Sequence, residues 1–467
     1  MNGKNKKIAC IFFMMQIVFL SSARNRDKTV ISNQGFSSLN SIQIKDRVFP
    51  RSVEELQLLM QKIEGPIAIA GMQCSMGGQS MVKNGIIIDT KNLAHIVNFD
   101  AVGKTITVQT GISWRSIQEY IDPYNLSLKV MQSYCDFSVG GSLSVNVHGR
   151  YVGYGPLIET VQSIKIIVAD GQLLTASRTQ NSDLFKAALG GYGLLGIIVE
   201  VTLSLTENCK IENKKIYMNV DSYFEYLSKI ILQDTSVVFH NGDLYPPYYN
   251  TVMSSTWYKT DKKLTITDRL QNLNGSIRQK IGISLARRAA WFKKMRINYE
   301  ASNSSEPIVC WRNYEAGYRI SQLKLPESFS TTLLQEYFIP LENCIEFVKA
   351  MRVILQAHNP NILNISIRHV KANNETLLSW SSKECCAFVI YYEQFKKQNS
   401  LKNTIGWTQK LIDAVLILNG TYYLPYQLNA RKDQFRAAYP TYKKFEEIKF
   451  LYDPKVRFQN YLWQAYF

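Results

Sequence analysis

The stretch Tyr134–Arg150 reads Tyr-Cys-Asp-Phe-Ser-Val-Gly-Gly-Ser-Leu-Ser-Val-Asn-Val-His-Gly-Arg, and the interpretation of the whole chain starts from it. Gly140 and Gly141 have no side chains, so a flat ligand can lie against the backbone, and glycine reaches positive φ without strain. Short polar side chains and His148 follow the glycine pair. Taken alone, the stretch fits a Gly-rich turn leading into a strand as well as a ligand-binding loop, because short glycine motifs often occur by chance.

Two further glycine-rich stretches favour the ligand-binding interpretation. Ala70–Gly78 follows directly after the apolar run Ile67–Ile69, and Leu189–Ile198 leads into a run rich in β-branched residues. Each of these loops therefore lies beside a strand-like segment. Together with the first stretch they suggest one extended, phosphate-bearing cofactor that is held by backbone amides.

These three stretches resemble the FAD-binding domain of the vanillyl-alcohol oxidase / p-cresol methylhydroxylase superfamily, the PCMH-type domain. The resemblance runs from Val48 to Leu205 and continues more thinly to the C-terminus. It implies an α+β fold with a two-subdomain FAD-binding domain and an α+β substrate domain whose sheet roofs the flavin. A Rossmann domain is not expected, since the first loop lacks Gly-x-Gly-x-x-Gly.

The chain divides into five expected parts. They are 1–23, a signal peptide or N-terminal anchor; 24–45, an arm; 46–208, the FAD-binding domain; 209–420, the substrate domain; and 421–467, a C-terminal segment that returns to the FAD-binding domain. In the leader, three lysines precede the uncharged apolar run Ile8–Leu20, which is shorter than the about 20 residues of a membrane span. We therefore expect an exported protein, periplasmic or secreted, or one anchored at the outer face of a membrane.

Composition describes a well-folded chain without an evident metal site. The 467 residues are 46% hydrophobic and 12% aromatic, which excludes a disordered protein and allows more than one domain. The eight cysteines show no Cys-x-x-Cys spacing, so neither a disulfide framework nor a zinc site is predicted.

The formal net charge of +17 is compatible with an anionic membrane surface, an anionic substrate or nucleic acid. No zinc-finger, RNA-stacking or helix-turn-helix pattern is present, so we expect no nucleic-acid partner. The segment Lys280–Arg296 contains six basic residues and no acidic one. One interpretation of this segment is a basic helix face exposed to solvent. The other is a segment that contacts a membrane surface or forms a mobile lid.

Local patterns predict mixed secondary structure. Ser52 and Glu55 form a capping box, and apolar residues then recur at helical spacing. Helices are expected over 52–63, 114–121, 184–189, 343–357 and 404–418. Strands are expected over 67–70, 86–89, 105–109, 161–169, 197–205, 236–240, 336–340, 364–370 and 387–392.

The resemblance implies which residues bind FAD. The first loop is expected to wrap the diphosphate, the second to line the pyrophosphate and the flavin, and the third to meet the adenine side through its backbone. The implied residues are Gly71, Met72, Gln73, Cys74, Ser75, Met76 and Gly77; Ser133, Ser138, Val139, Gly140, Gly141, Ser144, Val145, Asn146, Val147 and His148; Gly196, Ile197 and Ile198; and Tyr423.

Many members of the superfamily attach FAD through a histidine just before the serine of the first loop. Cys74 occupies that position here, and none of the five histidines does, so a histidyl link there is excluded. Other members use a cysteine in the second loop, close to where Cys135 falls. Noncovalent FAD is therefore expected, with a flavin bond to Cys135 or to Cys74 as the alternatives.

The second domain is similar to that of alditol and aldonolactone oxidases and of decaprenylphosphoryl-ribose oxidase. Ile367–His369 resembles the strand that carries a substrate-side arginine, which makes Arg368 a candidate, with Ser366 where those enzymes have an acid. Tyr426 occupies the position of a catalytic lysine, which is a departure from the relatives. Glu336 aligns with a strand whose polar side chains face the flavin.

Oxidation of an alcohol carbon needs a group that moves the hydroxyl proton and a cation that holds charge near the reduced ring. Arg368 suits the second task, and Tyr426 or Glu336 the first. Each also has an ordinary explanation: a surface ion pair for Arg368, core packing for Tyr426 and a solvated strand position for Glu336.

The resemblance implies an FAD-dependent oxidoreductase that acts on a CH–OH group of a polyol, sugar or sugar lactone, similar to D-arabinono-1,4-lactone oxidase. Oxygen, a quinone or a cytochrome would take the electrons. Two alternatives stay open. One is a membrane-associated polyprenyl-phosphate-sugar oxidase that forms half of an epimerase, and the other is a flavin- or sugar-binding protein without turnover.

Overall fold

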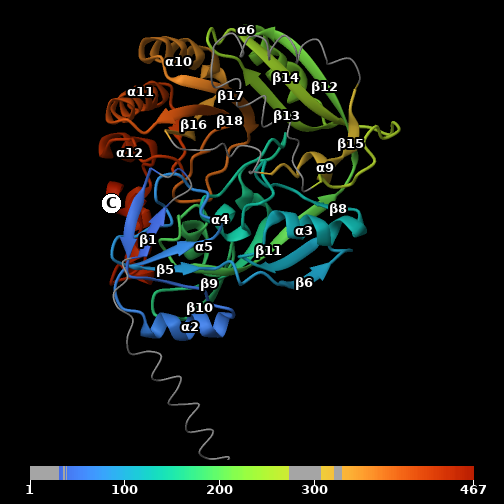
Figure 1. The fold of residues 1–467 in the computed structure, drawn as a ribbon. Coiled ribbons are helices and arrows are strands. Elements are labelled where there is room, and N and C mark those ends of the chain that lie inside the picture. The colour runs from blue at the N-terminus through green and yellow to red at the C-terminus, as the bar shows by residue number, and fades with distance from the viewer. Residues whose placement is uncertain (1–30, 35–36, 38, 273–306, 320–328) are drawn as a thin grey trace, which may run out of the picture.

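The computed structural model describes residues 31–34, 37, 39–272, 307–319 and 329–467. The expected leader and the basic segment Lys280–Arg296 lie outside these residues. The described chain forms two lobes, one above the other in Figure 1, with an eight-stranded sheet in the upper lobe and three- and six-stranded sheets in the lower one. Within the described residues, no helix has the length and apolarity that crossing a membrane requires.

A small parallel sheet at the start of the lower lobe carries the first glycine loop. Its order is β3 (Asp46–Val48), β5 (Ile86–Asp89), β4 (Ile67–Ala70). All of β5 and most of β4 are buried, as expected for a parallel strand that is covered on both faces.

Helix α2 (Val53–Lys62) connects β3 to β4. The predicted cap is present, because Ser52 Oγ accepts a hydrogen bond from the Glu55 amide at 3.1 Å. The Glu55 carboxylate, however, accepts from the amide of Arg51 at 2.7 Å rather than from that of Ser52.

The second sheet of the lower lobe is antiparallel. Its order is β10 (Leu173–Ser177), β9 (Val161–Ile167), β11 (Ile197–Glu207), β7 (Thr105–Gln109), β6 (Ile96–Asp100), and β8 (Leu126–Leu128) pairs with the end of β11. The helices of this lobe are α3 (Trp114–Ile121), α4 (Val139–Ser144) and α5 (Ser182–Ala188). Burial alternates along β11 as its sequence predicts, so one face of this strand packs on the core.

The upper lobe is one long sheet with helices on one face (Figure 1). Its order is β15 (Val309–Trp311), β12 (Lys210–Asn219), β14 (Thr251–Lys259), β13 (Val237–Leu244), β17 (Asn361–Val370), β18 (Cys385–Phe395), β16 (Ser330–Pro340), β19 (Thr421–Tyr422). The helices of this lobe are α6 (Val220–Tyr226), α9 (Arg312–Glu315), α10 (Cys344–His358) and α11 (Gln398–Ile417). Tyr337 of β16 contacts Phe347 of α10, so this side of the strand faces the helices.

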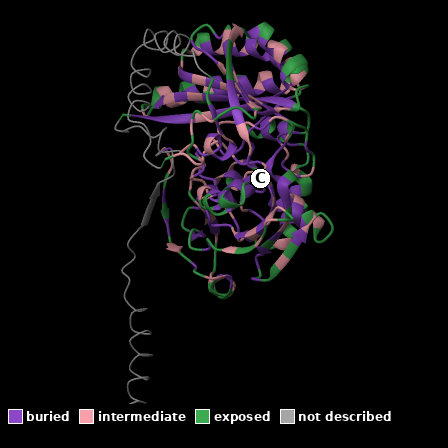
Figure 2. Ribbon diagram, turned by 90° about the vertical axis from the view of Figure 1, so that its right-hand side faces the viewer, coloured by how far each residue is buried: buried purple, intermediate pink, exposed green. Residues whose placement is uncertain are grey.

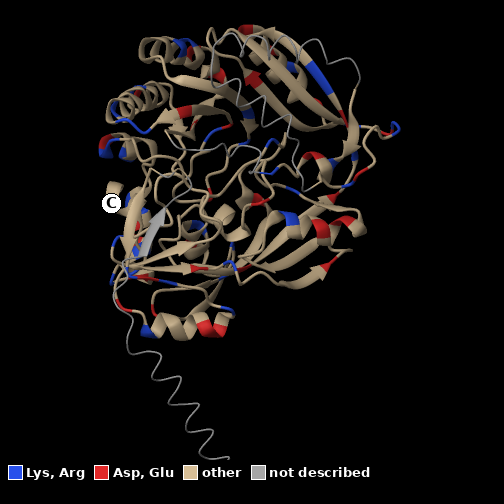
Figure 3. Cartoon of the chain, in the orientation of Figure 1, with Lys and Arg blue, Asp and Glu red and all other residues tan. Residues whose placement is uncertain are grey.

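One apolar core runs through both lobes. It includes Leu143 of α4, Ile164 of β9 and Phe338 of β16, all with almost no exposure. Figure 2 shows this as buried strands in both halves, with exposed residues mainly on the outer helices. In Figure 3 the charged side chains are scattered over both lobes rather than gathered on one element. Because the core is continuous, the surface between the lobes is a packed interface.

Two elements were not predicted from the sequence. The arm before residue 45 contains a hairpin of β1 (Ile31–Gln34) and β2 (Ser41–Ile44), because Ile42 and Ile44 alternate and bury against Ile87. The central stretch, for which the sequence left open a ligand-binding loop or a turn leading into a strand, forms helix α4.

The reason for α4 lies in its cap and its packing. Ser138 Oγ caps the first turn by accepting from the Gly141 amide at 3.4 Å, while Val139 and Leu143 are fully buried. Capping and burial thereby outweigh the low helix propensity of the two glycines. Gly140 and Gly141 have no positive φ, so their role here is to leave space.

The C-terminal helices α12 (Lys432–Ala438), α13 (Tyr442–Tyr452) and α14 (Tyr461–Tyr466) bring the chain back to the lower lobe. Phe458 bridges to Ile67 of β4. Arg457 donates to the carbonyls of Met60 at 2.8 Å and Ile63 at 2.6 Å. These contacts are organised by a fully buried ion pair between Lys449 and Asp453.

We predict that Lys449→Met destabilises the protein by about 3–5 kcal/mol, because the buried Asp453 carboxylate would lose its counter-charge. Lys444→Met on the exposed side of the same helix is the control and should change stability by less than about 0.5 kcal/mol. Urea unfolding followed by circular dichroism measures both. Equal stability of the two variants would show that the ion pair does not hold the C-terminal segment.

Candidate functional site: a cavity between the two lobes

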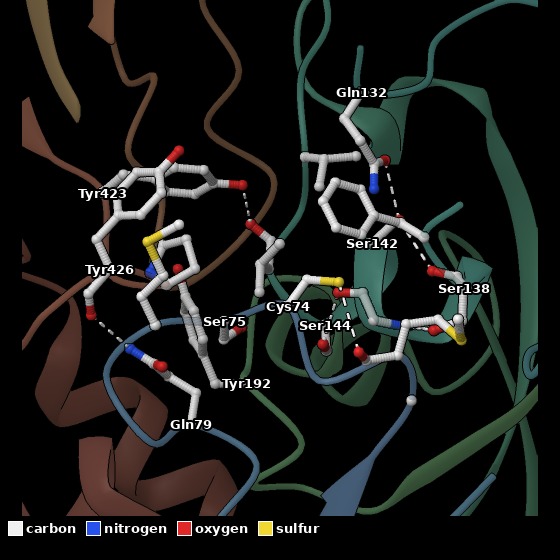
Figure 4. A pocket seen from close by; sticks show the side chains of 18 of the residues that line it. Cys74, Ser75, Gln79, Gln132, Ser138, Ser142, Ser144, Tyr192, Tyr423 and Tyr426 are labelled. Atoms are coloured by element: carbon white, nitrogen blue, oxygen red, sulfur yellow. Dashed lines mark hydrogen bonds between the residues drawn. The ribbon is translucent and has the colours of Figure 1, made fainter. Parts of the chain in front are cut away.

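A deep cavity lies between the lobes, with a water-accessible volume of about 360 Å³. The three glycine-rich stretches line it from the lower lobe, and one face of the eight-stranded sheet lines it from the upper lobe. Figure 4 shows Ser142 and Ser144 of α4 on one side of this view and Tyr423 and Tyr426 on the other, with Cys74 and Ser75 of the first loop between them. The loops that the sequence grouped together therefore do converge.

Most of the residues expected to bind FAD lie on this wall. Those that line the cavity are Gly71, Met72, Gln73, Cys74, Ser75, Met76, Ser133, Ser138, Gly140, Gly141, Ser144, Val145, Val147, His148, Gly196, Ile198 and Tyr423. The three catalytic candidates, Glu336, Arg368 and Tyr426, line it as well.

Four expected residues lie off the wall, each for a packing reason. Val139 and Ile197 are fully buried in the core. The Gly77 amide donates to the side chain of Gln79 at 2.9 Å. The Asn146 side chain accepts from the Ile158 amide at 3.0 Å. These four residues therefore support the loops behind the wall.

The first loop is held by the segment that carries Tyr426. The buried side chain of Gln79 accepts from the Gly77 amide at 2.9 Å and donates to the carbonyls of Leu424 at 2.5 Å and Tyr426 at 2.9 Å (Figure 4). Sequence reasoning missed Gln79, because its partners lie about 345 residues away. The cofactor loop and Tyr426 are thus parts of one hydrogen-bonded unit.

The lower wall fits a long polar cofactor such as FAD. Gln73 Nε2 and Ser133 Oγ are buried there and have no hydrogen-bond partner within the described chain. A Cβ at Gly71 would clash with Ser138 Oγ, whereas one at Gly141 would meet only that oxygen at 3.1 Å. Gly141 therefore leaves its side-chain space open beside the cavity.

The two cysteines considered for a flavin bond lie in different surroundings. Cys74 lines the cavity, and its thiol donates to the Met72 carbonyl at 3.5 Å. Cys135 is fully buried off the wall, and its thiol donates to the Gly317 carbonyl at 3.4 Å. Burial raises the pKa of Cys135 to about 11, so its nucleophilic thiolate is scarce at neutral pH. This geometry disfavours a bond from Cys135.

A chain of three side chains joins the lobes across the cavity. Tyr426 donates to Glu336 Oε2 at 2.9 Å, and Glu336 Oε1 lies 2.5 Å from His148 Nε2. The side chains of His148 and Glu336 are only 4% and 3% exposed. Phe338 and Trp380 contact the imidazole, with ring centroids at 5.6 and 5.1 Å.

The protonation states of Glu336 and Tyr426 depend on burial and on the charged groups around them. Burial by itself raises the pKa of Glu336, but His148, Arg368 and the Tyr426 hydroxyl together hold it below the ordinary value. Burial and the nearby Glu336 carboxylate raise the pKa of Tyr426 well above the ordinary value. Glu336 is therefore ionised and Tyr426 keeps its proton.

The hydrogen bonds of His148 indicate where its protons are. Nδ1 lies 3.1 Å from the Gly149 carbonyl, which can only accept, so Nδ1 carries a proton. Nε2 lies against Glu336 Oε1, so one proton lies between these two atoms. The contact is enclosed by the aromatic rings of Phe338 and Trp380.

The upper wall consists of alternate residues on neighbouring strands. Glu336 of β16 lies opposite Val389 of β18, which in turn lies opposite Ser366 of β17. Arg368 and Asn364 share that face with Ser366, because side chains two residues apart point the same way. Asn364 was not predicted from the sequence, although the i, i+2 spacing of polar residues along this strand is a signal that could have found it.

Further wall residues were not among those expected to bind FAD, although three of them lie within the glycine-rich stretches. They include Thr110, Gln132, Tyr134, Ser142 and Tyr192. Gln132 accepts from both Trp114 Nε1 and Ser142 Oγ at 2.9 Å (Figure 4).

Comparison with known proteins agrees with this geometry. Residues 45–177 match the family model described as an FAD-binding domain. The chain is a flavoprotein with a PCMH-type FAD-binding domain. It is also similar along most of its length to named proteins, at low identity.

Cytokinin dehydrogenase 9 of Oryza sativa subsp. japonica is 22% identical, with 90% of this chain and 86% of the relative covered. L-gulonolactone oxidase of Mus musculus is 22% identical, with 81% and 84% covered. L-galactono-1,4-lactone dehydrogenase of Arabidopsis thaliana is 24% identical, with 60% and 45% covered. With the FAD-binding domain, these similarities make the flavoprotein an FAD-dependent oxidoreductase.

We predict that Gly141→Val folds but loses most of its FAD, because the isopropyl group would occupy space on the cofactor wall. Gly406→Val on α11 is the control, since a Cβ there meets only His358 at 3.5 Å. The ratio of flavin to protein absorbance after gel filtration measures occupancy. Full occupancy in Gly141→Val would show that the cofactor does not approach α4.

We predict that acid precipitation releases the FAD into the supernatant, because Cys74 stands where a histidyl link would need histidine and Cys135 is buried. Absorbance of the supernatant and mass spectrometry of peptides from the pellet measure this. A flavin mass on a peptide that contains Cys74 would contradict the prediction. Cys74→Ser would then show whether the bond depends on that thiol.

Proposed function

We propose that this flavoprotein oxidises a CH–OH group of a sugar lactone or a related polyhydroxylated compound. The observation that carries the proposal is the buried chain Tyr426–Glu336–His148, which borders the cavity beside the polar face of β17. Such a chain provides a place for a hydroxyl proton. The polar residues of β17 suit a substrate with several hydroxyl groups.

The relatives support an oxidoreductase that acts on a small molecule, but they do not distinguish a sugar lactone from other substrates. An L-gulonolactone oxidase and a cytokinin dehydrogenase match at the same identity of 22%, so identity does not separate a lactone from a cytokinin. The character of the upper wall supports the lactone, because Ser366, Asn364 and Arg368 offer hydrogen bonds to a polar ligand.

When bound, FAD supplies the acceptor for the hydride that leaves the alcohol carbon. The protein's task is to remove the hydroxyl proton. Tyr426 already donates its own proton to Glu336, so its oxygen can accept from a substrate hydroxyl. As the substrate proton passes to the Tyr426 oxygen, the original Tyr426 proton passes to the carboxylate, which becomes neutral.

His148 and Arg368 adjust this proton acceptor. Both lower the pKa of Glu336, which keeps the carboxylate ionised while it is buried. Tyr426, where relatives have lysine, would act as a neutral relay between substrate and Glu336. The Nε atom of Arg368 is buried without a hydrogen-bond partner among the described residues, and it suits an oxygen of the ligand.

The proposal extends to the location of the protein and to its electron acceptor. The leader supports export, to a periplasm or outside the cell, or anchoring at the outer face of a membrane. Oxygen, a quinone or a cytochrome would accept the electrons from the reduced flavoprotein. A membrane contact would use Lys280–Arg296, whose basic and apolar residues suit an anionic surface.

We predict that Glu336→Gln slows flavin reduction by about a hundredfold or more, because the amide cannot take a proton. Anaerobic stopped-flow reduction by L-gulono-1,4-lactone measures the rate. Glu346→Gln on the exposed side of α10 is the control and should react at the parent rate. A parent rate in Glu336→Gln would remove this residue from the mechanism.

The pH dependence of the same rate tests the charge assignment. Since the pKa of Glu336 is lowered, the active carboxylate persists through neutral pH and is lost only below the ordinary value of 4.5. His148→Gln removes a positive partner, so the acid limb should move to higher pH. An unchanged limb, with FAD still bound, would show that His148 does not set the charge of Glu336.

A further inference from the structure

A polar cluster at the edge of the upper wall has no part in the proton chain. Asp243 of β13 lies opposite Ser366 of β17 in the sheet. Asp243 Oδ1 accepts from Asn364 Nδ2 at 2.8 Å and from Ser366 Oγ at 3.1 Å. Asn364 and Ser366 line the cavity, whereas Asp243 lies beside them on the neighbouring strand and does not line it. One carboxylate oxygen therefore takes a donor from each of two wall residues.

This arrangement decides which hydrogen bonds the wall can offer. Ser366 has a single O–H, and Asp243 takes it, so Ser366 presents lone pairs to a ligand. The Asn364 amide is oriented with its NH₂ group toward the carboxylate, because the reverse would set two oxygens against each other. Its Oδ1 is buried without a hydrogen-bond partner in the described part of the chain. Both residues are thus acceptors toward a ligand.

The two polar groups also lie close together. Asn364 Nδ2 is 3.5 Å from Ser366 Oγ, so the side chains converge although their residues are two positions apart. They can therefore contact hydroxyl groups on the same or on neighbouring carbons. Arg368 comes next on this face and offers the opposite polarity, a donor. Along β17 the wall runs from acceptors to a donor.

We propose that Asp243 is a positioning residue that sets substrate specificity, by making Ser366 and Asn364 an acceptor surface for adjacent substrate hydroxyl groups. The inference rests on the proposed function and narrows it. The substrate carries hydroxyl donors on neighbouring carbons and, beside them, a carbonyl or ring oxygen for Arg368. A 1,4-lactone of an aldonic acid has this pattern. An analogue that lacks one of the hydroxyls leaves a wall acceptor unsatisfied, which costs affinity.

The test compares lactones that differ by one hydroxyl. The FAD-loaded parent and Asp243→Leu are titrated anaerobically with D-ribono-1,4-lactone and with its 2-deoxy and 3-deoxy forms. Dissociation constants come from the change in flavin absorbance and from the concentration dependence of flavin reduction. Leucine has the same branching and number of side-chain heavy atoms as aspartate but cannot accept, so Ser366 and Asn364 are free to turn their donors outward.

In the parent, at least one deoxy lactone should bind about 10- to 100-fold more weakly than D-ribono-1,4-lactone. In Asp243→Leu this ratio should fall below about threefold, and Asp243→Asn, which keeps an acceptor oxygen, should restore most of it. A purely structural role would weaken the binding of all three lactones equally and leave the ratio unchanged. An unchanged ratio in Asp243→Leu overturns the inference.

Two other outcomes are distinguished from that one. If the parent neither binds nor is reduced by these lactones or by L-gulono-1,4-lactone, the proposed lactone substrate is wrong and the inference fails with it. If Asp243→Leu does not retain FAD, Ser366→Ala takes its place. That variant removes one wall acceptor and leaves the bond between Asp243 and Asn364 in place, so it should show the same fall in the ratio, and an unchanged ratio overturns the inference there as well.

Discussion

The contact between His148 and Glu336 is the interaction on which the arrangement of the site depends. The two residues are 188 positions apart in the chain, come from different lobes and lie 2.5 Å from each other. A buried charge is costly unless a partner compensates it, so neither lobe can present its half of this pair without the other. The interaction that joins the lobes beside the cavity therefore also lowers the pKa of Glu336, the proposed proton acceptor.

A second connection joins cofactor binding to the same machinery. Gln79 links the loop after β4 to the carbonyls of Leu424 and Tyr426. Tyr423 belongs to the same segment, and its hydroxyl donates to the Val145 carbonyl at 2.8 Å beside α4. The segment 423–426 thus touches the first and second glycine stretches at once. The cofactor loops and the tyrosine proposed as a proton relay are therefore positioned by one set of hydrogen bonds.

The two faces of the eight-stranded sheet carry different residues: one face packs into the core, and the other lines the cavity. Tyr337 and Ile367 point into the core under the helices and are fully buried. Their neighbours Glu336 and Arg368 line the cavity. Since pairing register aligns residues of adjacent strands, the cavity face carries a row that runs from Glu336 through Val389 to Ser366 and Asp243. The residues proposed for proton removal and for substrate recognition therefore lie at the two ends of that row.

The sequence by itself determined the local elements and the type of cofactor. Glycine spacing beside apolar runs marked the three loops, and alternation or helical spacing marked strands such as β4 and helices such as α10. It also identified Glu336, Arg368 and Tyr426 as candidates, and all three line the cavity. These features are readable because backbone preference and hydrophobic period act within a few residues.

Tertiary structure decided which partners those residues have. It placed His148 on Glu336, Asp243 beside Ser366 and Gln79 against Tyr426, and it made α4 a helix despite its two glycines. These outcomes depend on strand register, on capping and on burial against residues hundreds of positions away. Local sequence preferences cannot identify such distant partners, because the contacts that stabilise these arrangements form only when the core packs.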